Sequence, residues 1–200
     1  MLRELYYEFL PYRSMFAPFL TLSAIAVPCW LLVRLDRLRD NGHRLSVTRE
    51  IVLLTFVVYL AGLASATLLP NRSDRLLAAG RGGVDLRPNR GSLTCSPALL
   101  PEGSSRGFCV RNARGNVALY FPLGVLLPLV WMRLRFWWGV LIVFVVSFSI
   151  ELVQYFSSAW GSYRAADVND LILNVFGGCF GLAVVFLLRW RPGPTRQPGY

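Results

Sequence analysis

The stretch SFSIELVQYFSSAWGSYRAADVNDLILNVFGGCFG, residues 147–181, decides the fold because it joins two strongly apolar segments through one short polar loop. Two hydrophobic helices joined in this way lie antiparallel and next to each other. At about 100° per residue, each helix also carries polar residues along one face. These two stripes comprise Ser147, Glu151, Gln154 and Ser158 in the first helix, and Asp167, Asp170, Asn174, Gly177 and Gly181 in the second. We expect the stripes to meet between the helices.

The rest of the chain has the composition of a membrane protein. Of its 200 residues, 54% are hydrophobic, and the long apolar runs contain few charges. A helix needs about 20 such residues to span a membrane, so the sequence predicts an all-α, polytopic transmembrane helix bundle with about five spans. The expected spans are residues 16–33, 51–69, 117–132, 136–156 and 168–188.

The segments around these spans complete the expected organisation. Residues 1–15 are amphipathic, and residues 16–188 form one transmembrane domain. A long loop, residues 70–116, separates the second span from the third and is rich in Gly, Ser, Pro and Arg. The tail, residues 189–200, is basic and rich in Pro and Gly, which predicts disorder.

The formal net charge of +10 comes almost entirely from arginine. The arginines lie between apolar spans and form no compact basic module, so the expected partners are membrane lipids and not nucleic acid. The loop at 34–50, the turn with Arg133 and Arg135, and the C-terminal tail share one side of a five-span bundle. The positive-inside rule makes that side cytoplasmic. We therefore expect a multi-pass protein of the cell membrane, with its N-terminus outside and its C-terminus in the cytoplasm.

The loop at 70–116 would then lie outside, although it contains eight arginines. Its two cysteines, Cys95 and Cys109, support this orientation. A cysteine pair in a loop rich in Gly and Ser is most simply explained by a disulfide, and disulfides persist in oxidising compartments.

This topology brings the polar groups of the spans to one membrane face, the outer one. Glu151 lies about five residues from the end of its helix, at a depth of roughly 8 Å. A carboxylate there costs several kcal/mol unless it is protonated, paired or hydrated. Arg164, in the following loop, is the nearest candidate partner. Glu151 is therefore either part of a functional site or a buried group that fastens helices together.

The two aspartates that begin the fifth span have a simpler explanation. Asp167 is well placed to cap that helix, and both Asp167 and Asp170 favour the positive end of its dipole. Capping explains one acid well, but two acids together with Asn174 less well. On the same face, Gly177 and Gly181 would let another helix approach closely.

The chemistry of this cluster stays open at the level of sequence. Paired carboxylates can act as a general acid and base, bind a divalent cation or hold a cationic group. The single histidine, His43, lies in the loop at 34–50, and the chain contains no CxxC, no HExxH and no phosphate-binding glycine loop. We therefore expect no cofactor and no metal site.

Three segments of the chain carry the pattern of a known family. NVALYFPLGVLLPLVW, residues 116–131, is similar to a segment of the VanZ-like family in which an asparagine precedes an apolar run with P-L-G. SFSIELVQYF, residues 147–156, resembles S-x-x-I-E-x-x-Q, and RAADVNDLILNVFGGCFG, residues 164–181, resembles R-x-x-D-x-x-D-x-x-x-N-x-x-G. TLLP, residues 67–70, is similar to the end of the preceding family span. The resemblance singles out Asn116, Pro122, Gly124, Glu151, Gln154, Arg164, Asp167, Asp170 and Asn174.

The resemblance implies a role in the cell envelope. The family is named after a membrane protein of glycopeptide-resistance gene clusters that is linked to teicoplanin tolerance. We expect a polar pocket near one membrane face that engages an envelope lipid, a polymer or a glycopeptide. The alternatives are a membrane enzyme that uses Glu151 and Asp170 on envelope lipids or polymers, and a structural or interaction protein without catalysis. The arginine-rich loop with Cys95 and Cys109 is not a feature of the family core.

Overall fold

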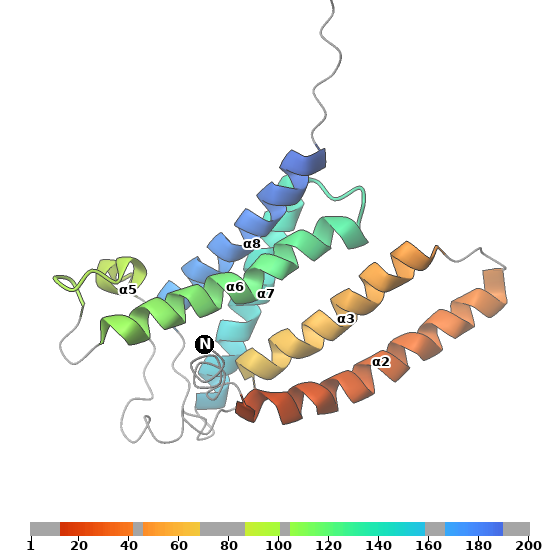
Figure 1. Ribbon diagram of the computed structural model, residues 1–200, viewed down its shortest axis with the longest axis horizontal. Coiled ribbons are helices and arrows are strands. Elements are labelled where there is room, and N and C mark those ends of the chain that lie inside the picture. The colour runs from red at the N-terminus through yellow and green to blue at the C-terminus, as the bar shows by residue number, and fades with distance from the viewer. Residues whose placement is uncertain (1–12, 42–45, 69–86, 101–104, 159–166, 190–200) are drawn as a thin grey trace, which may run out of the picture.

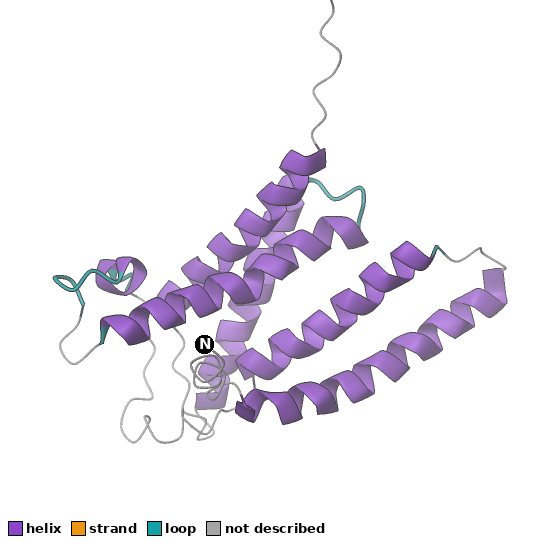
Figure 2. Ribbon diagram, in the orientation of Figure 1, coloured by secondary structure: helices purple, strands orange, loops and turns teal. Residues whose placement is uncertain are grey.

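A computed structural model describes residues 13–41, 46–68, 87–100, 105–158 and 167–189, and these are almost entirely helical (Figures 1 and 2). The helices are α2 (Arg13–Asn41), α3 (Val47–Leu68), α5 (Arg90–Thr94), α6 (Arg106–Val130), α7 (Phe136–Ser158) and α8 (Val168–Arg189). Apart from the short α5, each of them is long and apolar enough to cross a membrane. The predicted all-α bundle with five spans is thereby confirmed.

The expected loop at 70–116 is partly wrong, because it contains α5 and the first turns of α6. α6 begins at Arg106 and not near residue 117. Ser105 sets this start: its side chain accepts a hydrogen bond from the N–H of Phe108 at 3.1 Å, as an N-cap residue does. The early turns of α6 are polar, so hydropathy does not distinguish them from a loop.

α2 also extends beyond its expected span at both ends. It begins at Arg13, within the segment expected to precede the membrane domain, and continues to Asn41 through the arginines that were assigned to a loop. α7 and α8 lie close to their expected bounds, and α8 ends at Arg189. Residues 1–12 and 190–200, which include most of the expected tail, lie outside the described residues.

α6 and α8 run side by side in the same direction, and α7 packs against α8 in the opposite direction (Figure 1). Glycines bring the backbones of α6 and α8 into contact. A Cβ atom on Gly124 would meet the carbonyl group of Gly178, and one on Gly181 would lie 3.1 Å from the Cα of Gly124. A Cβ atom on Gly177 would likewise lie 2.9 Å from the Cα of Val117. Small residues permit this close approach, as in other membrane bundles.

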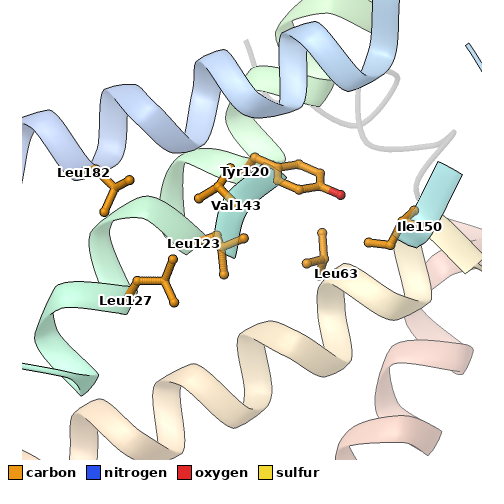
Figure 3. Packing of buried hydrophobic residues seen from close by; sticks show 7 residues of the cluster. All are labelled: Leu63, Tyr120, Leu123, Leu127, Val143, Ile150 and Leu182. Carbon is orange, nitrogen blue, oxygen red and sulfur yellow. The ribbon is translucent and has the colours of Figure 1, made fainter. Parts of the chain in front are cut away.

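The core lies where α3, α6, α7 and α8 converge (Figure 3). Its side chains are almost completely enclosed by the protein, and Tyr120, Val143 and Leu182 are 0% exposed. The remaining members of this cluster are Leu63, Leu123, Leu127 and Ile150. Within a bilayer, van der Waals contact and not the release of water holds such a core together.

α2 packs against α3 at the edge of the bundle, as the hairpin of Figure 1 shows. The ring of Phe19 lies over Gly62. Where the hairpin turns, Arg34 and Glu50 form a two-point ion pair, in which Nε donates to Oε2 at 2.8 Å and Nη2 donates to Oε1. Large apolar side chains on the outer face of α2 are exposed and are suited to contact with lipid.

Candidate functional site

The polar residues of the spans gather where α3 and α7 end and where α6 and α8 begin, which is the left end of the bundle in Figure 1. We call this group the polar cluster, and it comprises Asn112, Asn116, Glu151, Gln154, Asp167, Asn169, Asp170 and Asn174. Six of the seven predicted pocket residues belong to it. The seventh, Arg164, lies outside the described residues, so its expected pairing with Glu151 stays a prediction.

Asp170, in the first turn of α8, is turned towards α6. Its Oδ1 atom accepts hydrogen bonds from Nδ2 of Asn112 at 2.9 Å and from Nδ2 of Asn116 at 2.6 Å. The two asparagines are four residues apart, so they share one face of α6. An ionised carboxylate only accepts hydrogen bonds, and neutral amides supply donors without adding a compensating positive charge. These two bonds connect the Asp170 carboxylate at the start of α8 to α6.

Asp167 lies immediately before α8 and interacts with its first turn. Its Oδ1 atom accepts hydrogen bonds from the backbone N–H of Asn169 at 2.8 Å and from the side-chain Nδ2 of the same residue at 2.7 Å. The first of these bonds is the one that an N-cap aspartate makes. Glu151 approaches from α7, and its Oε2 accepts the backbone N–H of Asp167 at 3.2 Å. Asp167 therefore caps α8 and also lies in contact with a second acid.

The polar contact between α7 and α8 continues deeper into the bundle. Nδ2 of Asn174 donates to the hydroxyl of Ser147 at 3.1 Å, and both residues are buried. The ring of Tyr120 on α6 belongs to the apolar core, and its hydroxyl points away from Val143, to the side on which Leu63 and Ile150 lie (Figure 3). The stripes of α7 and α8 thus meet, and Asn174 lies one turn below Asp170.

Gln154 has a different role from the acids. Its Nε2 atom donates to the backbone carbonyl of Thr67 at 2.7 Å, next to the end of α3. The hydroxyl of Thr67 in turn donates to the carbonyl of Leu63 at 2.7 Å. Gln154 therefore fastens α7 to α3 beside the acids.

The segment that contains α5 also reaches the polar cluster. A disulfide joins Cys95, at the end of α5, to Cys109, in the first turn of α6. The backbone N–H of Asn89, which precedes α5, donates to Oδ1 of Asn169 at 2.9 Å. Asn89 and Asn112 were not predicted as site residues because both lie in the segment that was expected to be a loop. The spacing of Asn112 and Asn116 was the available signal for a helical face there.

The described residues show no group of three or more His, Cys, Asp and Glu side chains placed to hold a metal ion. Asparagine side chains and backbone N–H groups contact the acids of the polar cluster. The arrangement presents carboxylate oxygens and amides at one end of the bundle. Such groups exchange hydrogen bonds with hydroxyl, amide and ammonium groups.

A family model described as VanZ/LLP1 matches residues 56–189, which is more than half of the chain. The chain belongs to the VanZ/LLP1 family. The resemblance of its three sequence segments is thereby confirmed, and its five apolar helices make this VanZ/LLP1 protein a multi-pass membrane protein. No curated protein and no solved structure matches the chain. The matched region contains the whole polar cluster and α5, whereas α2 precedes it.

Proposed function

We propose that this VanZ/LLP1 protein acts in the envelope at the cell membrane, where its polar cluster binds the polar part of an envelope lipid, a polymer or a glycopeptide. By this binding it changes susceptibility to teicoplanin-type antibiotics. The observation that carries the proposal is the gathering of Glu151, Asp167 and Asp170 with several amides at one end of the bundle. Ionisable groups within membrane spans are energetically costly and rare, and they mark functional sites by default. An acidic cluster at a helix end is also within reach of lipid headgroups.

The depth of the acids supports a ligand at the boundary between headgroups and acyl chains. Asp170 lies in the first turn of α8, and Glu151 lies seven residues before the end of α7 at Ser158. At a rise of about 1.5 Å per residue, Glu151 is roughly 10 Å from that helix end. A headgroup could contact both acids without entering the apolar core.

The chemistry of the cluster favours ligands that carry hydroxyl, amide or ammonium groups. Carboxylates accept hydrogen bonds from all three, and the asparagine side chains can both donate and accept. Sugars and peptides of envelope precursors carry such groups, as do glycopeptide antibiotics. The Cys95–Cys109 disulfide lies at the same end of the bundle, which favours the outer face and an outward N-terminus.

A membrane enzyme acting on envelope lipids or polymers is the second candidate. It is favoured by the different surroundings of two carboxylates. Asp170 is held by two asparagine amides, whereas Glu151 approaches a backbone N–H next to a second acid. General acid–base catalysis can use two carboxyl groups that lie within reach of one substrate. In this alternative Glu151 and Asp170 share proton transfer, and turnover that survives Glu151→Gln would exclude it.

The proposal is tested by measuring susceptibility to teicoplanin and vancomycin in cells that express the wild type, Glu151→Gln or Asp170→Asn. Membrane levels of the proteins are matched, and Gly107→Ala serves as the control because Gly107 is exposed and has open space around it. We expect the wild type and the control to raise teicoplanin tolerance, and the two acid variants to lose that effect.

Other outcomes count against the proposal. A wild type that gives no protection, or acid variants that protect as well as the wild type, would overturn it. Acid variants that fail to accumulate in the membrane would favour the structural alternative. Labelling of Cys95 and Cys109 by cytoplasmic thiol reagents alone would contradict the proposed orientation.

A further inference from the structure

α5 and the residues on either side of it form a compact cap, which we define as residues 89–100 and call the α5 cap. The side chain of Asn89 accepts the N–H of Gly91 at 2.8 Å and so begins the helix. Cys95 ends the helix in the left-handed conformation, with a φ of 51°. The chain then folds back, and the backbone of Leu99 lies so close to Gly91 that no side chain would fit there.

One buried side chain connects the α5 cap to the acids. Asn169 is 2% exposed, and both the oxygen and the nitrogen of its side-chain amide form hydrogen bonds. Its Oδ1 accepts the backbone N–H of Asn89 at 2.9 Å, and its Nδ2 donates to Oδ1 of Asp167 at 2.7 Å. Because a backbone N–H can only donate, it fixes the oxygen of the amide towards the cap. The NH₂ group must then face Asp167.

The disulfide completes a ring of contacts around this connection. Cys95 of the cap is bonded to Cys109, and Asn112, one turn further along α6, donates to Asp170. Asp170 follows Asn169 in the chain, so the ring returns to the cap. A helix as short as α5 is not stable by itself. The covalent bond to α6 therefore holds the cap in place against α8.

We infer that Asn169 is a positioning residue for Asp167, and that the Cys95–Cys109 disulfide maintains this position through the α5 cap, so that the polar cluster responds to thiol reduction. In the reduction step a dithiol reagent supplies two electrons and two protons. The S–S bond breaks, two cysteine thiols form, and the reagent becomes a cyclic disulfide. α6 stays packed against α8 through its glycines, whereas the cap and its hydrogen bond to Asn169 loosen.

The first test is backbone hydrogen exchange, measured by mass spectrometry on the full chain in detergent micelles with and without dithiothreitol. We expect reduction to accelerate exchange at least tenfold in residues 90–95 and in residues 169–171, whose amides bond to Asp167. Acceleration confined to residues 90–95 would overturn the inference. A Cys29→Ser/Cys179→Ser background removes the remaining cysteines, and Cys95→Ser/Cys109→Ser should reproduce the reduced state without reagent.

The second test asks whether the disulfide acts through Asn169. In Asn169→Ala, exchange at residues 169–171 should already be fast, and reduction should add little there while it still accelerates residues 90–95. If reduction accelerates exchange at residues 169–171 as much in Asn169→Ala as in the wild type, the disulfide and Asn169 act independently, and the inference is overturned. If Asn169→Ala does not fold, the comparison of the oxidised and reduced wild type still decides whether the cap and the start of α8 are coupled.

A third measurement follows the accessibility of the Asp167 carboxylate to a chemical label. A water-soluble carbodiimide with an amine nucleophile labels accessible carboxyl groups, and the labelled sites are found by mass spectrometry. Labelling of Asp167 should rise several-fold on reduction and in Asn169→Ala, whereas Glu50, in its ion pair at the other end of the bundle, should not change. Equal labelling of Asp167 in both redox states would contradict its positioning by the cap. None of these measurements requires the ligand of the cluster to be known.

Discussion

Replacing Gly124 by alanine should loosen the contact between α6 and α8 that brings Asn116 to Asp170. A Cβ atom at this position would meet the carbonyl group of Gly178 and would lie 2.7 Å from the backbone nitrogen of Leu182. Ordinary contacts of a Cβ atom are 3.4–4 Å, so the helices would have to separate by at least about 1 Å. The obstructing atoms belong to the backbone, and no change of rotamer can relieve them.

The free energy of unfolding should fall measurably. A gap of about 0.5–1 Å forfeits a quarter to a half of the dispersion energy of the atoms that face it. Overpacking of this kind costs about 1–3 kcal/mol, while alanine gains up to about 1 kcal/mol in helix propensity. Gly115→Ala is the matched control, because Gly115 lies on the same helix with nothing within 4 Å of its Cβ position. Gly124→Ala should therefore be less stable than Gly115→Ala by about 1–3 kcal/mol.

The assay is unfolding in mixed micelles by increasing fractions of sodium dodecyl sulfate, followed through the fluorescence of the six tryptophans. Gly124→Ala should unfold at a clearly lower detergent fraction than Gly115→Ala. Equal midpoints for the two variants would refute the reasoning, because they would show that the α6–α8 contact yields to a methyl group without cost.

Three further predictions use the same unfolding assay. Asn116→Ala should lower the free energy of unfolding by about 1–3 kcal/mol, and Asn112→Ala by less than about 1 kcal/mol, because the amide of Asn116 is half-buried and that of Asn112 is exposed. A larger loss in Asn112→Ala than in Asn116→Ala would contradict the described geometry. Arg34→Glu should lower the free energy of unfolding by about 1–2 kcal/mol, since its partner Glu50 is only 18% exposed. Adding Glu50→Arg should restore most of this loss. No recovery in the double variant would show that loss of the ion pair is not the cause. Ser147→Ala should lower the free energy of unfolding by about 1–3 kcal/mol, because it removes the hydroxyl that accepts a hydrogen bond from the buried amide of Asn174 on α8. An unchanged free energy of unfolding would indicate that another acceptor replaces the hydroxyl.

The five spans could be predicted because the length of an apolar run decides whether a helix crosses a bilayer, and no tertiary contact is needed for that decision. The bounds were less predictable where a helix continues into polar sequence. The first turns of α6, from Arg106, depend on the N-cap at Ser105 and on a covalent bond from Cys109 to the α5 cap. Hydropathy registers neither of these.

The contents of the polar cluster were easier to anticipate than its pairings. Helical periodicity predicted that the stripe with Glu151 meets the stripe that begins at Asp167, and the contact between these two residues lies there. It could not show that Asp170 turns towards α6, since that depends on how α6 and α8 cross. The crossing is set by Gly124 and Gly181, whose backbone contacts appear only once the helices are packed.

The separation of a polar end from an apolar core has an electrical consequence. From Leu123 to Leu127 on α6, and at Val143 and Leu182 on the neighbouring helices, the described interior is hydrocarbon. The voltage across a membrane falls mainly over such low-dielectric material, where one elementary charge crossing 100 mV changes the energy by about 2.3 kcal/mol. A charged molecule that reaches Asp170 from the adjacent face crosses little of that drop. Its occupancy should therefore be nearly the same in energised and in depolarised cells.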